Sequence, residues 1–201
     1  MKQDLKNVLK DCYNPSSKEF SIIDVPTFNF LMIDGSGDPN TSPEYQAAIE
    51  ALYSISYTLK FSMKKSAGID YLVMPLEGLW WADDLSDMSD KSLWKWTAMI
   101  MQPDFISEPL VHDSIEASRG KRGLPSLEKL HFEPYAEGLS VQILYYGPYS
   151  EEGPTISRMH TYIREHGFEL AKKHHEIYIG DPRRCAPEKL KTILRQPVRR
   201  I

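Results

Sequence analysis

The feature that most constrains this chain is an order of elements that occurs twice. In each half, a β-rich segment leads into a glycine-containing loop, a helix and two further strands. The last strand of each pattern ends in Gln-Pro, at Gln102-Pro103 and at Gln196-Pro197. Each such unit has one sheet whose apolar face a helix can cover. The repeat predicts an α+β fold of tandem βαββ units with pseudo-two-fold symmetry. We expect an antiparallel sheet, helices on one face and a central ligand cleft.

The expected domain organisation follows from this repeat. Residues 1–19 are polar and predict an N-terminal arm or short helix, and residues 20–201 predict a single domain. Half one covers about 20–106, a connector about 107–130, and half two about 131–201.

Hydrophobic spacing and Pro or Gly breaks predict the elements within each half. The first half has strands within 20–33, 71–81 and 93–101 and a helix over about 41–63. The second half has strands over 132–134, 139–146, 174–179 and 190–198 and a helix over 151–170.

Charge, hydrophobic patterning and cysteine content argue against a nucleic-acid partner, membrane association and secretion. The net charge of −4 argues against a nucleic-acid partner, which needs a basic face. No apolar run approaches the roughly 20 residues that span a bilayer, so no membrane association is expected. The N-terminus lacks the apolar core of a signal peptide. Cys12 and Cys185 fit no metal spacing and are interpreted as reduced thiols of a cytoplasmic protein.

Glu176 is the first candidate for chemistry, in the segment His175-Glu176-Ile177-Tyr178-Ile179. Alternate residues of a strand share a face, so Glu176 and Tyr178 point one way and Ile177 the other. We expect the apolar face with Ile177 to meet the helices. Glu176 then lies on the opposite face, either as a solvated glutamate or as the carboxylate of a cleft.

Glu77 is the second candidate, in the segment Pro75-Leu76-Glu77-Gly78-Leu79. The neighbouring Gly78 would let a flat ligand approach the backbone closely. The alternative interpretation is a bulge glycine next to core tryptophans.

Aromatic side chains form a third candidate set. Aromatic walls around a carboxylate suit a flat or cationic ligand through stacking and cation–π attraction, although such rings also fill ordinary cores. The candidate ligand-binding residues are Trp80, Trp81, Trp94, Trp96, Tyr57, Tyr145 and Tyr178.

Metal and triad chemistry are poorly supported. His174 and His175 are adjacent and face opposite ways in a strand, and the spacing of His160 and His166 is poor for shared ligation on a helix. No Gly-x-Ser-x-Gly elbow is present. The sequence therefore predicts no metal and no cofactor.

Four segments resemble the GyrI-like small-molecule-binding family. They are PLEGLWW (75–81), KWTAMIMQPDFI (95–106), EGLSVQILYYGPYSEEGPTI (137–156) and HHEIYIGDPRRCAPEKLKTILRQPV (174–198). That family is similar to the effector domains of the regulators BmrR and Rob. The resemblance implies a tandem βαββ fold and a shielded glutamate in a central cleft, a role that falls on Glu176. Because only about 20 residues precede the first strand, a stand-alone module is expected.

The resemblance also extends to hydrolases of cyclopropanoid DNA-alkylating compounds. A glutamate shielded by aromatic rings could take a proton from water, which would then open the strained ring. Glu77 is the alternative base, and the two glutamates could share the role because they come from corresponding parts of the halves. The remaining hypotheses are a module that sequesters or senses small molecules and a gyrase-inhibitor-like interaction protein. The natural ligand and the oligomeric state are not readable from the sequence.

Overall fold

The computed structural model describes residues 3–83, 90–182 and 184–201. Arg183, part of the C-terminal segment quoted above, lies outside the described residues. The chain divides into two compact units. Unit 1 comprises Met1–Leu5 and Phe28–Tyr135, and unit 2 comprises Lys6–Thr27 and Ala136–Ile201. The α+β class and the antiparallel strand pairing are confirmed.

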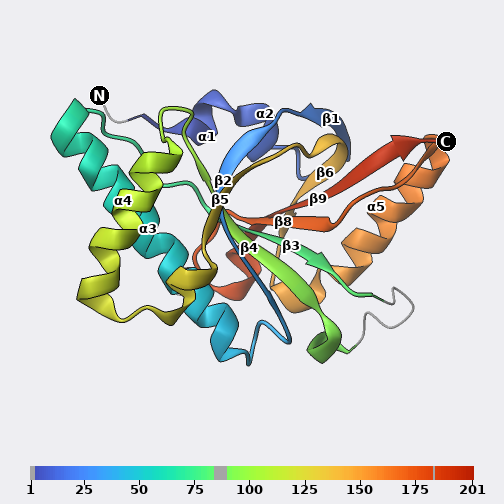
Figure 1. The fold of residues 1–201 in the computed structure, drawn as a ribbon. Helices are drawn as coiled ribbons and strands as arrows, with labels where there is room; N and C mark the ends of the chain where they lie inside the picture. Colours follow the sequence, from blue (N-terminus) through green and yellow to red (C-terminus); the bar gives the residue numbers. More distant parts are fainter. Residues whose placement is uncertain (1–2, 84–89, 183) are drawn as a thin grey trace. The chain divides into compact units, whose positions relative to one another are not determined.

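Unit 1 contains an antiparallel sheet in the order β3-β4-β2-β5. Its strands are β3 (Leu76–Trp81), β4 (Lys95–Gln102), β2 (Phe28–Ser36) and β5 (His131–Tyr135). Helix α3 (Pro43–Ala67) packs on β2 and β4, and α4 (Glu108–Arg122) lies beside α3, as Figure 1 shows. Short 3-10 helices η2 (Lys91–Leu93) and η3 (Pro125–Lys129) complete the unit.

Helix α3 begins and ends where its sequence dictates. The Ser42 hydroxyl accepts a hydrogen bond from the backbone N–H of Tyr45 at 3.3 Å, and Pro43 occupies the first turn. The helix ends at Gly68, whose φ of 69° is the left-handed conformation that favours glycine. Its buried stripe comes from Ala48, Ala51, Leu52, Ile55, Leu59 and Met63.

Unit 2 contains an antiparallel sheet in the order β1-β6-β9-β8. Its strands are β1 (Ser21–Val25), β6 (Gly138–Tyr146), β9 (Lys191–Arg200) and β8 (His174–Tyr178), and β7 (Phe168–Leu170) also pairs with β9. The remaining elements are α1 (Leu5–Val8, at the boundary of the two units), α2 (Lys10–Tyr13), η4 (Tyr149–Glu151), α5 (Gly153–Glu165) and η5 (Pro187–Lys189).

Helix α5 covers one face of the unit 2 sheet. Met159 and Ile163 of the helix share a buried cluster with Ile143 of β6 and Leu194 of β9. The short helix α2 is held to the other face by its backbone, because Arg195 donates to the carbonyl of Cys12. The four-residue helix α2 thus contacts the face opposite α5.

The strand pairing differs from the predicted half boundaries. Strand β1 directly precedes β2 in the chain but pairs with β6 in unit 2. Strand β5 directly precedes β6 but pairs with β2 in unit 1. Each unit thus takes one edge strand from the segment that directly precedes the first long strand of the other unit. The predicted connector, including α4, belongs to unit 1.

Two element bounds also differ from the prediction. The helix expected over 151–170 ends at Glu165, and Phe168–Leu170 form a strand after Gly167, whose φ is 77°. The strand expected from residue 71 begins at Leu76. Among the described residues, no helix combines the length and the apolar character that crossing a membrane requires.

Candidate functional site

The pairing register of β8 decides which face Glu176 occupies. Glu176 lies directly opposite Leu194 of β9, and directly opposed residues of an antiparallel pair share a face. Leu194 belongs to the cluster that packs against α5. Glu176 therefore lies on the α5 side of its sheet. Ile177, which was expected to mark the helix side with Glu176 opposite it, is fully buried on the face away from α5.

Both oxygens of the Glu176 carboxylate have neighbours on its own strand. The Tyr178 hydroxyl donates a hydrogen bond to Oε2 at 2.8 Å. Nε2 of His174 lies 3.6 Å from Oε1. The side chains of His174 and Glu176 are only 15% and 14% exposed. Because the three residues alternate along β8, they form one row on one face. The carboxylate is thus shielded and held between a phenol and an imidazole.

Further aromatic groups lie around this row. The rings of Tyr149 and Tyr178 meet edge to face with centroids 5.4 Å apart. Burial raises the pKa of Tyr149 to about 12, assisted by the charges of nearby carboxylates that include Glu152 and Glu176. Tyr145 shares the α5 side of the sheet and donates to the carbonyl of Pro148 at 3.3 Å.

Thr192 places a hydroxyl on the same face. It lies opposite both Tyr145 and Tyr178 in the strand register, and its side chain is fully buried. Its hydroxyl forms no hydrogen bond with the residues that the structure describes. A buried polar group of this kind is the type of atom that a bound molecule or water satisfies.

Three of the predicted tryptophans gather in unit 1. Trp80 meets Trp94 with ring centroids 5.7 Å apart, and Tyr45 of α3 contacts both Trp80 at 5.6 Å and Trp96 at 4.9 Å. Trp96 is fully buried, and a Cβ on Gly35 would come within 2.3 Å of its ring. Trp96 is therefore a core side chain of unit 1.

Trp81 and Tyr57 lie apart from that tryptophan cluster. Trp81 is half-buried and alternates with Trp80 along β3, so it faces away from α3. Tyr57 is 46% exposed and stacks between Tyr53 and Phe61 along α3.

Glu77 is fully buried in unit 1. It lies opposite Met99 of β4. The two residues next to Met99 along β4 face α3, so Met99 faces the other way. It therefore lies on the side of its sheet away from α3, whereas Glu176 lies on the α5 side of its own sheet. The two glutamates do not occupy equivalent positions, so the repeat gives no basis for a shared role.

A buried charge network in unit 2 was not predicted from the sequence. Glu137 accepts hydrogen bonds from Arg195 at 2.9 Å and bonds with the His175 ring at 2.8 Å, and all three side chains are at most 2% exposed. Arg195 also donates to Gln142 and to the Cys12 carbonyl. Burial alone would raise the pKa of Glu137, but His175 and Arg195 outweigh it and lower that pKa to about 2. The network fixes α2 to the sheet.

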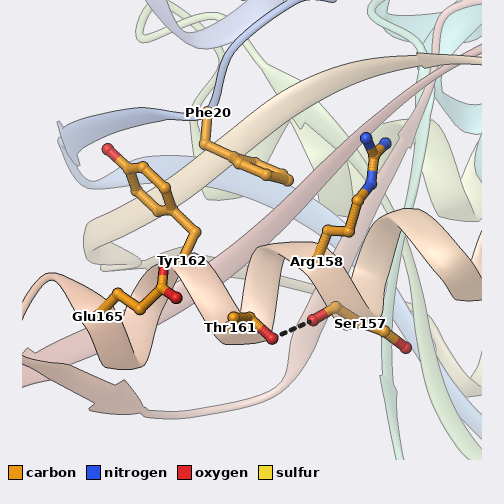
Figure 2. A pocket seen from close by; sticks show the side chains of 6 residues that line it. All are labelled: Phe20, Ser157, Arg158, Thr161, Tyr162 and Glu165. Carbon is orange, nitrogen blue, oxygen red and sulfur yellow. Dashed lines mark hydrogen bonds between the residues drawn. The ribbon is translucent and has the colours of Figure 1, made fainter.

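A separate open hollow lies beside α5 (Figure 2), with a volume of about 390 Å³. Phe20 and Tyr162 form its apolar part, their ring centroids 5.2 Å apart. The other lining residues are Ser157, Arg158, Thr161 and Glu165. None of the predicted site residues lines it, so the row on β8 remains the better chemical candidate. Among the described residues, no group of three or more His, Cys, Asp or Glu side chains could hold a metal ion.

Comparisons with known proteins place this architecture in a family. The family model described as the GyrI-like small molecule binding domain matches residues 18–199. An uncharacterized conserved protein from Listeria innocua is 40% identical with a TM-score of 0.92, over 98% of this chain and 100% of that chain.

Two further solved structures extend the comparison. A protein from Listeria innocua described as a hydrolase is 38% identical with a TM-score of 0.86, over 98% and 100% of the two chains. The C-terminal domain of EcmrR is similar in fold alone, at 12% identity and a TM-score of 0.57 over 91% and 98%. Curated protein sequences gave no match. The chain belongs to the GyrI-like small-molecule-binding family.

Proposed function

We propose that this protein binds flat, aromatic or cationic lipophilic molecules against the Glu176 row and hydrolyses electrophilic members of that class. Cyclopropanoid alkylators are the proposed substrates, and detoxification in the cytoplasm is the proposed role. Glu176 is the proposed general base. The observation that carries the proposal is a shielded carboxylate whose two oxygens lie next to Tyr178 and His174 on one strand face.

The surroundings of Glu176 suit proton abstraction from water. A carboxylate held by a phenol at 2.8 Å keeps a fixed orientation, and a general base must lie within hydrogen-bond reach of the proton that it takes. Tyr149 and Tyr178 offer ring faces and edges for a flat substrate. The full-length similarity to a Listeria innocua protein described as a hydrolase supports the same class of reaction.

The proposed reaction balances without a cofactor. Glu176 takes a proton from water, and the water oxygen forms a bond to a cyclopropane carbon. The strained carbon–carbon bond breaks, and its electron pair moves into the conjugated ketone, whose oxygen becomes a phenolate. Glu176 then releases the proton that it took, and the phenolate oxygen takes up one proton, so the base is regenerated and the product is the substrate plus one water.

Glu77 and the tryptophans of unit 1 are further candidates for the base and for ligand contacts. Glu77 is the alternative base because it is a fully buried carboxylate. Trp80, Trp81, Trp94 and Tyr57 remain proposed ligand contacts, and Trp96, although predicted as one, is a fully buried core side chain. The second candidate function is binding without turnover, which the family's small-molecule-binding character favours.

Turnover of a cyclopropanoid alkylator by the purified protein tests the proposal. The loss of the substrate chromophore is followed by ultraviolet absorbance, and the product mass is measured. Glu176→Gln should abolish turnover while ligand binding persists. Glu165→Gln, an exposed glutamate of the same unit, is the matched control and should retain the wild-type rate. A stoichiometric complex without turnover in all three proteins would leave a binding module.

A further inference from the structure

Two partly buried imidazoles, those of His174 and His160, interact in unit 2. Both ring nitrogens of His174 are buried and form no hydrogen bond with the residues that the structure describes, and the same holds for Nε2 of His160 on α5. Buried polar atoms without hydrogen bonds are uncommon and usually have a functional reason. The imidazole of His174 nevertheless directs Nε2 toward the carboxylate, at 3.6 Å from Oε1.

The arrangement gives the two Glu176 oxygens different partners. Tyr178 donates to Oε2 at 2.8 Å, so that oxygen is engaged by a hydrogen bond of ordinary length. Oε1 has the looser contact with His174. In unliganded sites, catalytic contacts are often long and tighten when the substrate is bound. Oε1 is therefore the oxygen available to take a proton, and His174 is the side chain that can hold it in place.

We infer that His174 is a positioning residue for Glu176: when substrate is bound, its imidazole N–H donates to Oε1 and orients the carboxylate. This inference rests on the proposed function and assigns to His174 the orientation of its base.

The charged and titratable groups around His174 fit this assignment. On β8, Glu176 and Tyr178 share its face, and His160 of α5 lies close enough to interact with it electrostatically. The neighbouring β9 contributes the uncharged side chains Leu194 and Thr192 to this face. Burial lowers the pKa of His160, and the charges of His174 and Arg164 lower it further.

Substitutions that separate hydrogen-bond donation from packing test the inference. Gln at position 174 keeps an N–H donor, whereas Leu removes it. At pH 8, His174→Gln should keep kcat within about 3-fold of wild type. His174→Leu should lower kcat about 100-fold with KM changed by less than about 3-fold, because a misplaced base loses rate more than affinity. His112→Gln, an exposed histidine of unit 1, is the matched control and should match wild type.

The split between kcat and KM, together with rescue by the conservative variant, supplies a readout that a packing role would not move. A loss of kcat in His174→Gln as large as that in His174→Leu, or a full wild-type kcat in a folded His174→Leu, would overturn the inference.

Glu176→Gln run beside these variants separates the two claims. If Glu176→Gln loses turnover while His174→Leu matches wild type, the positioning role fails and the proposed function stands. If Glu176→Gln keeps turnover, the proposed function fails and the role of His174 falls with it. Loss of turnover in Glu176→Gln and in His174→Leu, with kcat retained in His174→Gln, would support both.

Discussion

Leu76 and Glu176 occupy the same register position in the two repeats. Leu76 lies opposite Ile100, and Glu176 lies opposite Leu194. Ile100 and Leu194 each precede the Gln of a Gln-Pro pair by two positions. One repeat therefore fills this position with an aliphatic side chain and the other with a carboxylate. The scaffold accepts an apolar residue there, so the glutamate is a departure from the repeat.

This equivalence predicts that Glu176 costs stability. Glu176→Leu would restore the residue type of the other repeat and remove a largely buried charge. We expect the free energy of unfolding to rise by about 1 kcal/mol while function is lost, as when a functional group is replaced by a packed one. Urea unfolding of wild type and variant measures the difference. A variant that is less stable by a similar amount would show that the contact with Tyr178 outweighs the charge.

The Glu137 network predicts acid sensitivity. The carboxyl has a folded-state pKa of about 2, below its ordinary value of 4.5, so its stabilisation is present above the ordinary value. That stabilisation is lost as the pH falls from about 5 towards 2. Glu137→Gln should lower stability at pH 7 by about 3–5 kcal/mol, because Arg195 and His175 lose a buried partner. It should also flatten the pH dependence within that window.

Urea unfolding at several pH values between 7 and 3 checks this prediction. Glu133→Gln, an exposed glutamate on β5, is the control and should follow the wild-type curve. A Glu137→Gln variant with an unchanged acid dependence would mean that other carboxyl groups cause the acid loss.

The close approach of Gly35 to Trp96 predicts a strong steric effect. A methyl group on Gly35 would come within 2.3 Å of the buried indole, which cannot move without disturbing Tyr45. Gly35→Ala should lower the free energy of unfolding by about 1–3 kcal/mol. Gly153→Ala, where nothing lies within 4 Å, is the control and should change stability by less than about 1 kcal/mol. Thermal or urea unfolding of both variants decides the point.

Much of the fold could be predicted because its signals are local. The start of α3 follows from Ser42 and Pro43, and the order of elements follows from the repeat. The exchange of β1 and β5 could not be predicted. Strand β1 directly precedes β2 in the chain but pairs with β6, and β5 directly precedes β6 but pairs with β2. No local pattern encodes that choice, because pairing partners are set by contacts distant in sequence.

The candidate site was predicted in part. Glu176 and Tyr178 were correctly expected to share a strand face, because alternation is a local rule. The face itself was misjudged because Ile177 is as buried as the residues beneath α5. His174 was considered only as a metal ligand, so its proximity to Glu176 was missed. The Glu137–His175–Arg195 network joins positions up to 58 residues apart and has no sequence pattern.

The rate of cyclopropanoid ring opening by Glu176→Gln, compared with wild type and Glu165→Gln, tests the central claim most directly. We expect wild type and Glu165→Gln to turn over the substrate and to release a product one water heavier. In Glu176→Gln the turnover rate should fall by at least about 100-fold, with substrate binding retained. Turnover by Glu176→Gln at the wild-type rate would contradict the claim.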